Sequence, residues 1–270
     1  MGQPAALAFK AKTMINFFRR IRKQLADDNK PLKYMRYAIG EIVLVVIGIL
    51  IALSINNWNE SNKENEIGLG YLHRIHSDLV KDNSYLGEKE LVSQDNHKSF
   101  YNYIQSMYLE QSNTDEFREL TSSVFWEAEN LILEDRTYIE ITNSGKFNFI
   151  ENEKLRDQIM GYYRRYYAID EHISEMNQTG IDMFANSYKK IIKFYKVFEP
   201  IFNKKSMVND SDWKYINNPS SQEFKDLESA ALFYFYKQSV FEKYYIELKT
   251  KGSKLIEQIE YEVSLGKNNR

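Results

Sequence analysis

The sequence predicts an all-α protein with a single N-terminal transmembrane helix followed by an extracytoplasmic up-down bundle of about four helices. Three observations support this prediction. A strongly apolar run occupies residues 37–58. In much of the remaining chain, apolar side chains recur at spacings of three and four residues, as one face of a helix requires. Only four prolines and eleven glycines interrupt the 270 residues, and no alternating run is long enough to predict a sheet.

Composition limits both the size of the folded part and its chemistry. With 43% hydrophobic residues, the chain can form a domain of roughly 200 residues beyond the apolar run. It has no cysteine, which excludes disulfides, zinc–thiolate sites and thiol nucleophiles. Nine Lys or Arg and two Asp precede residue 37, whereas 27 basic and 35 acidic residues follow residue 56. This asymmetry about an apolar run indicates membrane topology rather than nucleic-acid binding, which requires a basic folded face.

The first segment, residues 1–36, is predicted to be a basic cytoplasmic segment. Within it, residues 14–25 predict an amphipathic helix, because a turn of 100° per residue gathers the apolar side chains on one face. Such a helix suits a membrane interface that contains anionic lipid. Met14 is also an alternative start of the chain. The side chains expected at the interface are Phe17, Phe18, Arg19, Arg20, Ile21 and Arg22.

The second segment, residues 37–58, is predicted to span the membrane. As a helix it is about 33 Å long, at 1.5 Å per residue, which matches a hydrocarbon core of about 30 Å. Tyr37 and Trp58 lie where interfacial aromatic side chains are expected. The positive-inside rule then places the N-terminus in the cytoplasm and residues 59–270 outside it.

Three other interpretations of the apolar run fit less well. A cleaved signal peptide with its site at Ala52-Leu53-Ser54 would have a shorter basic region before its apolar core. The pair Arg19-Arg20 resembles a twin-arginine signal but lies about twenty residues too early. A buried core helix would need a polar face, which this run lacks.

One carboxylate, Glu41, lies near the cytoplasmic end of the predicted span. On a helix, Gly48 and Ala52 lie within about 20° of it, and Val45 and Ile55 lie about 40° away. Small residues four apart allow two membrane helices to pack closely, so this stripe predicts a helix–helix contact. Alternatively, the Glu41 carboxylate extends to the cytoplasmic headgroups. The sequence leaves both interpretations open.

The domain over residues 59–270 is predicted to contain four main helices. The first runs from about Lys63 to Leu109, continuing the span. The second begins after an N-cap at Asn113 and carries Phe117, Leu120, Val124 and Leu131. A short segment and a turn at Asn143-Ser144-Gly145 separate it from the third. The apolar seam of the third helix comprises Leu155, Ile159, Tyr162, Tyr166, Ile169, Ile173 and Met176. The fourth carries Phe224, Leu227, Ala231, Tyr234, Gln238, Phe241, Tyr245 and Leu248.

No catalytic, cofactor-binding or metal-binding residue is predicted. His73 and His76 share a helix face, but a metal would need a further donor from another helix, so they are interpreted as solvent-facing. The segment GYYRRYY contains the one candidate ligand or partner face, in which arginines stack on aromatic rings. The alternative is that these tyrosines fill the core. The residues concerned are Tyr162, Tyr163, Arg164, Arg165, Tyr166 and Tyr167.

Three stretches resemble a known family: the start MINFF with the following IR, the run YAIGEIVLVVIGILIALSINNWNE, and the segment TYIEITNSGKFNFIENEKLRDQIMGYY. The family consists of uncharacterised single-span membrane proteins common in flavobacteria and their relatives. The resemblance covers most of the chain from Met14. It implies a bacterial inner-membrane protein with a helical periplasmic domain, and it supplies no established activity or catalytic residues.

These observations predict a non-catalytic, membrane-anchored protein that acts as an interaction or scaffold module. Its expected partners are the lipid bilayer and either another protein or a second copy of the chain, with no nucleic acid and no cofactor. The alternative is a small-ligand sensor or binding module with a tyrosine-rich groove between helices. An interaction module predicts exposed aromatic patches. A ligand module predicts an aromatic pocket between helices.

Overall fold

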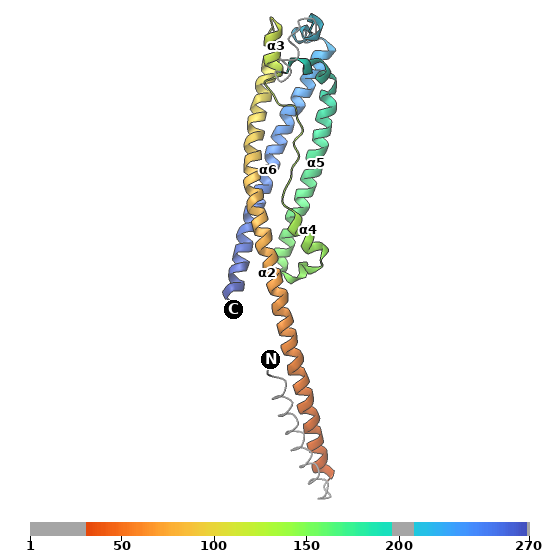
Figure 1. Cartoon of the computed structure of the whole chain (residues 1–270), viewed down its shortest axis with the longest axis vertical. Coiled ribbons are helices and arrows are strands. Elements are labelled where there is room, and N and C mark those ends of the chain that lie inside the picture. Colours follow the sequence, from red (N-terminus) through yellow and green to blue (C-terminus); the bar gives the residue numbers. More distant parts are fainter. Residues whose placement is uncertain (1–30, 196–207, 269–270) are drawn as a thin grey trace, which may run out of the picture. The chain divides into compact units, whose positions relative to one another are not determined.

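The computed structural model describes residues 31–195 and 208–268, and these form α-helices and short 3-10 helices without a strand (Figure 1). The expected all-α class is therefore confirmed for this part of the chain. The chain divides into two compact units, residues 1–64 and 65–270. The predicted amphipathic helix at residues 14–25 and its six interfacial side chains lie outside the described residues.

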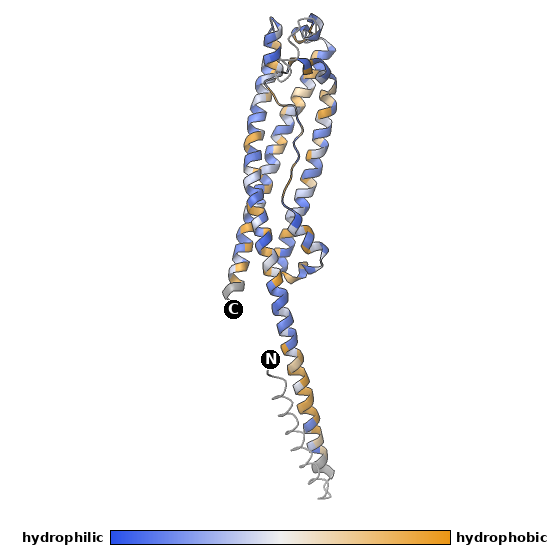
Figure 2. Ribbon diagram, in the orientation of Figure 1, coloured by the Kyte–Doolittle hydropathy of each residue, from blue (hydrophilic) through white to orange (hydrophobic). Residues whose placement is uncertain are grey.

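The described part of the first unit belongs to α2, which runs from Pro31 to Met107. Figure 2 shows a continuous hydrophobic run on this helix, and its most apolar 18 residues have a mean hydropathy of 2.8 with none of them buried. Exposed apolar side chains occur on every face between Ile39 and Trp58. The helix therefore has the length and composition that crossing a membrane requires.

The second unit is built on three long helices: the later part of α2, α5 (Glu153–Ile191) and α6 (Gln222–Asn268). Figure 1 shows them running alongside one another. Polar contacts join them: the Gln94 amide donates to the Glu242 carboxylate at 2.8 Å, and the Arg165 guanidinium binds Glu247. Helix periodicity in the sequence thus predicted these three elements, with α2 continuing from the apolar run as expected.

The interior of this unit contains two apolar clusters separated by a polar layer. One cluster includes Leu86, Met176 and Phe241, and the other includes Phe100, Phe184 and Tyr234. Between these positions each long helix carries buried polar side chains. They are Ser93 on α2, Asn177 on α5, and Lys237 and Gln238 on α6.

The predicted second long helix is wrong beyond its first two turns. Its helix, α3, spans only Thr114–Thr121, and no helix covers the chain from there to Asp135. Leu131 and Leu133 are buried there, whereas Ile132 between them is 72% exposed, which is the two-residue alternation of extended backbone. The spacing of Phe117, Leu120, Val124 and Leu131 suggested a helix, but the apolar side chains of the second half follow the shorter period. An extended segment therefore lies where most of the second of the four predicted helices was expected.

The predicted N-cap and the predicted turn are both confirmed. The Asn113 side chain accepts hydrogen bonds from the amides of Asp115 and Glu116 and so caps α3. Gly145, after α4 (Arg136–Asn143), adopts φ +69°, which a residue with a side chain rarely tolerates, and ends that helix. The remaining short elements are η1 (Lys146–Phe149), η2 (Ile192–Phe194), η5 (Asp210–Asp212) and η6 (Lys214–Asn217).

Candidate functional site

The extended segment, residues 122–135, is held by side chains of the three long helices. A segment without a neighbouring strand must find other partners for its amides and carbonyls, since burying them unpaired is costly. Six side chains supply these bonds. The pairs are Asp82 with the Glu134 amide, Tyr85 with the Asn130 carbonyl, Tyr163 with the Glu134 carbonyl, Tyr166 with the Leu133 amide, Asn177 with the Glu129 carbonyl, and Tyr234 with the Trp126 carbonyl.

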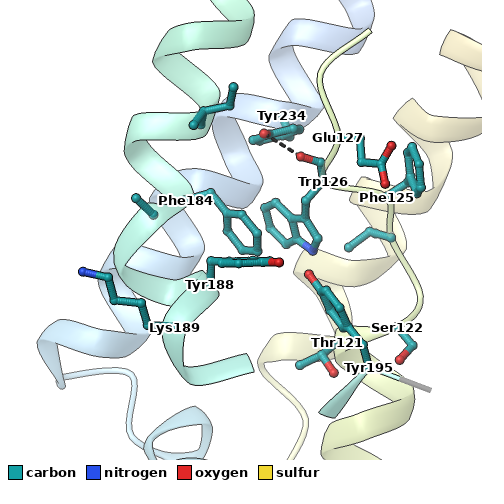
Figure 3. A pocket seen from close by; sticks show the side chains of 13 residues that line it. Thr121, Ser122, Phe125, Trp126, Glu127, Phe184, Tyr188, Lys189, Tyr195 and Tyr234 are labelled. Atoms are coloured by element: carbon teal, nitrogen blue, oxygen red, sulfur yellow. Dashed lines mark hydrogen bonds between the residues drawn. The ribbon is translucent and has the colours of Figure 1, made fainter. Parts of the chain in front are cut away.

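Beside this segment lies a pocket of about 740 Å³, which we call the Trp126 pocket (Figure 3). Its volume falls within the range of small-molecule sites. One wall is the start of the extended segment, and the other is the last three turns of α5. Aromatic and aliphatic side chains dominate the lining. The lining residues are Thr121, Ser122, Val124, Phe125, Trp126, Glu127, Ile181, Phe184, Ala185, Tyr188, Lys189, Tyr195 and Tyr234.

Trp126 is fixed by ring contacts and by its own backbone. Its indole stacks on Phe184 with the ring centroids 4.1 Å apart and an interplanar angle of 3°. Tyr234 contacts the indole edge-on at 5.2 Å, and the Tyr234 hydroxyl donates to the Trp126 carbonyl at 2.8 Å. Burial raises the pKa of Tyr234 to about 12, so this hydroxyl keeps its proton at neutral pH. The indole is therefore held in one orientation.

The indole nitrogen of Trp126 is the least satisfied polar group at this pocket. Trp126 is 8% exposed, and its Nε1 is buried without a hydrogen-bond partner among the described residues. Figure 3 shows the nitrogen on the side of the ring that faces Tyr188 and Tyr195. Leaving a buried donor unpaired costs about 1–3 kcal/mol. This cost is relieved if a bound molecule supplies an acceptor.

Other aromatic side chains at the pocket retain accessible surface. Phe125 is 51% exposed and Tyr188 is 41% exposed, although aromatic side chains are usually largely covered. The rings of Tyr188 and Tyr195 lie 6.2 Å apart, and burial raises the pKa of the Tyr195 hydroxyl. The pocket thus offers ring surface together with neutral hydrogen-bonding groups.

The predicted ligand or partner face at residues 162–167 is used differently. Tyr162, Tyr163 and Tyr166 are buried in the apolar core, as the alternative interpretation expected. Tyr163 stacks on Tyr138 at 4.2 Å, and its hydroxyl serves the extended segment. The tyrosines of this motif therefore do not line the Trp126 pocket.

The two arginines of this motif differ in their surroundings. Arg165 makes a two-pronged ion pair with Glu247, with N–O distances of 2.8 and 2.7 Å, and this contact raises the pKa of Arg165. Its guanidinium also lies 5.6 Å from the Tyr244 ring centroid. Arg164 is exposed, and Tyr167, also exposed, donates from its hydroxyl to Asp135 at 3.0 Å.

The candidate packing stripe of the apolar run is exposed on α2. Val45, Gly48, Ala52 and Ile55 are exposed, and a Cβ added at Gly48 would meet nothing within 4 Å. Glu41 is partly buried. Tyr37 and Trp58, the expected interfacial residues, are both exposed at the two ends of the run.

Of the two histidines interpreted as solvent-facing, His73 is exposed, whereas His76 is partly buried and pairs with a carboxylate of α6. His76 Nε2 lies 2.9 Å from the Glu260 carboxylate. Over the described ranges, no group of three or more His, Asp or Glu side chains has metal-binding geometry.

The pocket residues escaped sequence analysis because they are distant in the chain. Residues 121–127, 181–189, 195 and 234 contribute to it. Glu127 and Glu129 near Trp126 resemble an ordinary solvated pair. The available signal was the run Val124-Phe125-Trp126, three large apolar residues next to a polar turn, which is more than one face of a surface helix would bury.

The polar layer next to the pocket contains a buried cation. Lys237 is 1% exposed, its Nζ donates to the Asn177 side-chain oxygen at 3.1 Å, and it lies 4.1 Å from the Tyr234 ring centroid. Burial lowers the pKa of Lys237 to about 8, partly offset by the negative charge of Glu129. Nearby in the chain, Gln238 Oε1 is buried without a partner among the residues described. Tyr234, which lines the pocket, thus also contacts this buried cation.

Comparison with protein families shows which family the chain belongs to. A model described as "Family of unknown function (DUF6090)" matches residues 41–219, and the chain belongs to this family. The resemblance to a family without an assigned activity is confirmed to that extent. Comparisons with curated proteins and with solved structures gave no match.

Proposed function

We propose that this protein is a non-catalytic, single-span protein of a bacterial inner membrane whose extracytoplasmic helical domain binds a small apolar ligand in the Trp126 pocket. The basic residues before α2 support a cytoplasmic N-terminus, because positive charge is retained on that side. The resemblance to flavobacterial single-span proteins supports the location. The ligand site differs from the groove expected at residues 162–167, whose tyrosines are mostly buried.

The observation that carries this proposal is the pocket itself. A concave, partly open pocket of about 740 Å³ lined by aromatic rings is large enough to hold a small molecule and presents apolar surface to it. Phe125 and Tyr188 keep part of their surface available there. Concave, mostly apolar sites with a few fixed polar groups are typical of small-molecule binding.

The experiment uses indane, an apolar two-ring hydrocarbon, as a probe of the full-length protein in lipid nanodiscs. The indole N–H resonances of Trp58, Trp126 and Trp213 are followed by NMR during titration. We expect a saturable shift of the Trp126 resonance, because it lines the pocket, and little change at Trp213. Partition of indane into lipid lowers its free concentration equally for every variant, so variants remain comparable.

Two variants on α5 separate pocket binding from general adsorption. Ala185→Phe fills the pocket and should abolish the shift of Trp126, because Ala185 lines it. Met183→Phe adds the same ring on the same helix but outside the lining, and it should leave binding unchanged. A Trp126 resonance that never saturates, or that responds equally in both variants, would contradict the proposal.

A second candidate function, an interaction or scaffold module, is favoured by exposed rings elsewhere on the second unit. Tyr101 and Tyr236 are 54% and 59% exposed, and Tyr101 lies 6.4 Å from Phe235. Together with the exposed stripe at Gly48 and Ala52, they support contact with a second copy or another protein. Chemical crosslinking in native membranes tests this candidate, and recovery of monomer alone would contradict it.

A further inference from the structure

The chemistry of the Trp126 pocket narrows the class of ligand, an inference that rests on the proposed function. A purely hydrocarbon ligand would leave the Trp126 N–H unpaired in an even drier environment. Burying an unpaired donor costs free energy, whereas supplying an acceptor recovers it. The indole cannot turn toward another acceptor, because Phe184 stacks on its face at 4.1 Å. A bound molecule that brings an acceptor to the indole N–H would satisfy this donor.

Two hydroxyls lie at the same end of the pocket. Figure 3 shows the hydroxyls of Tyr188 and Tyr195 pointing toward the indole nitrogen of Trp126. Neither hydroxyl hydrogen-bonds to another residue in the part of the chain that the structure describes. The indole N–H can only donate, whereas each hydroxyl can both donate and accept, so this end of the pocket can donate to an acceptor atom from the indole and from a hydroxyl. Tyr188 is 41% exposed and can move aside to admit a ligand atom.

The charges at the pocket do not favour an ionic ligand. The lining contains one cation, Lys189, and one carboxylate, Glu127. Figure 3 shows the Lys189 amine extending away from the aromatic rings, with Glu127 on the opposite wall. A charged ligand held among the rings would lose hydration without a facing counter-ion, which is unfavourable. The acceptor at the indole is accordingly a neutral one.

We propose that the Trp126 pocket recognises a neutral, flat ring compound that carries a carbonyl-type acceptor, with the acceptor bound by the Trp126 indole N–H and the rings lying against the partly exposed ring of Tyr188. Flat rings suit this lining because aromatic pairs prefer offset-stacked or edge-on contacts. The second lone pair of the same oxygen can accept a hydrogen bond from the hydroxyl of either Tyr188 or Tyr195. The other side chains that line the pocket determine which ring system fits.

The test compares indane with 1-indanone, which has the same two-ring skeleton and adds one carbonyl. Both are titrated into the full-length protein in nanodiscs, and the Trp126 indole N–H resonance is followed. We expect 1-indanone to move this proton downfield, as formation of a hydrogen bond does, whereas indane produces only a small ring-current shift. This comparison of chemical shifts uses the wild-type protein, so it does not depend on a substitution being tolerated.

A variant then measures the contribution of the hydrogen bond. Trp126→Phe should lower the affinity for 1-indanone two- to tenfold more than it lowers the affinity for indane. This range corresponds to a net hydrogen bond of about 0.5–1.5 kcal/mol. Binding is read from the resonances of ¹³C-methyl-labelled Ile181, which lines the pocket. Tyr188→Phe is a second variant, with a smaller selective loss expected.

The outcomes separate this inference from the proposed function. Saturable binding of both probes, with equal losses in Trp126→Phe and no downfield shift, would overturn the carbonyl acceptor and leave the apolar site standing. Binding of neither probe would overturn both. A selective downfield shift with 1-indanone supports both.

Discussion

Replacing Lys237 with methionine removes a positive charge from the polar layer between the two apolar clusters. The ammonium is 1% exposed and hydrogen-bonds to Asn177. Its pKa is lowered to about 8 by burial, against 10.5 for the free side chain. Between these two values the unfolded chain binds a proton that the folded protein has released. The free energy of unfolding of the wild type must therefore rise with pH in this window.

The magnitude follows from the size of the shift. A difference of about 2.5 pKa units corresponds to about 3 kcal/mol over the full titration. Between pH 7 and pH 9.5 the gain is about 2 kcal/mol, because the unfolded lysine has only begun to lose its proton at the upper limit. The Lys237→Met variant lacks this term. Its unpaired Asn177 oxygen carries a cost, but that cost does not vary with pH.

The assay is urea unfolding of the full-length protein in detergent, followed by the fluorescence of Trp126 and Trp213, which both lie in the second unit. Free energies of unfolding are extrapolated to water at pH 7, 8, 8.75 and 9.5. The free energy of unfolding of the wild type minus that of the variant should rise by about 2 kcal/mol across this pH range. Subtraction removes the contribution of tyrosines, whose ionisation in the unfolded chain begins near the upper limit. A difference that stays constant would refute the assignment of a depressed pKa to Lys237.

Three further predictions, two of them with a matched control substitution, concern other parts of the structure. Burial, with neighbouring carboxylates, raises the pKa of Asp82 to about 6. Asp82→Asn should therefore raise the free energy of unfolding at pH 7 by up to about 3 kcal/mol, and this gain should be lost below about pH 4. A gain of equal size at pH 3.5 would contradict this prediction. A Cβ at Gly68 would lie 2.0 Å from a backbone oxygen of η1, so Gly68→Ala should destabilise the protein by about 2 kcal/mol or more. Gly70 has open space around it, so Gly70→Ala should stabilise the protein by about 1 kcal/mol in the same urea assay. Equal effects would refute the close approach. Glu41→Ala should reduce crosslinking between copies in membranes without preventing insertion, and Leu50→Ala on the opposite face should not; unchanged crosslinking in Glu41→Ala would favour extension of the carboxylate to the headgroups.

Periodicity predicted the long helices because each buries one continuous face. The seam from Leu155 to Met176 is buried throughout α5, as the spacing of three and four residues requires. The caps at Asn113 and Gly145 were also readable, since their chemistry is local. These features depend on residues within one or two turns of each other.

The extended segment was not predictable by the same means. Its hydrogen-bond partners, such as Asp82 and Tyr234, lie far away in the chain, so nothing in residues 122–135 alone indicates that its backbone will be satisfied without a helix. The sequence predicted that the tyrosines of residues 162–167 either fill the core or form a binding face. Tyr163 shows a third use, in which the ring fills the core while the hydroxyl pairs with backbone.

The candidate site was missed for a related reason. Trp126 and Phe184 stack at 4.1 Å although they are separated by more than fifty residues, and the pocket exists only because α3 ends at Thr121. Had the second helix continued as predicted, Trp126 would have been one residue on a helix face. The error in the fold and the missed site therefore have one cause.

The most direct test of the account is the position of a bound probe. Isotope-filtered NMR of the full-length protein in nanodiscs, saturated with 1-indanone, detects proton contacts shorter than about 5 Å between probe and protein. We expect contacts from the probe to Tyr188, Ile181 and the Trp126 indole N–H. Contacts confined to the apolar run at residues 37–58, or their absence at all three pocket residues, would contradict it.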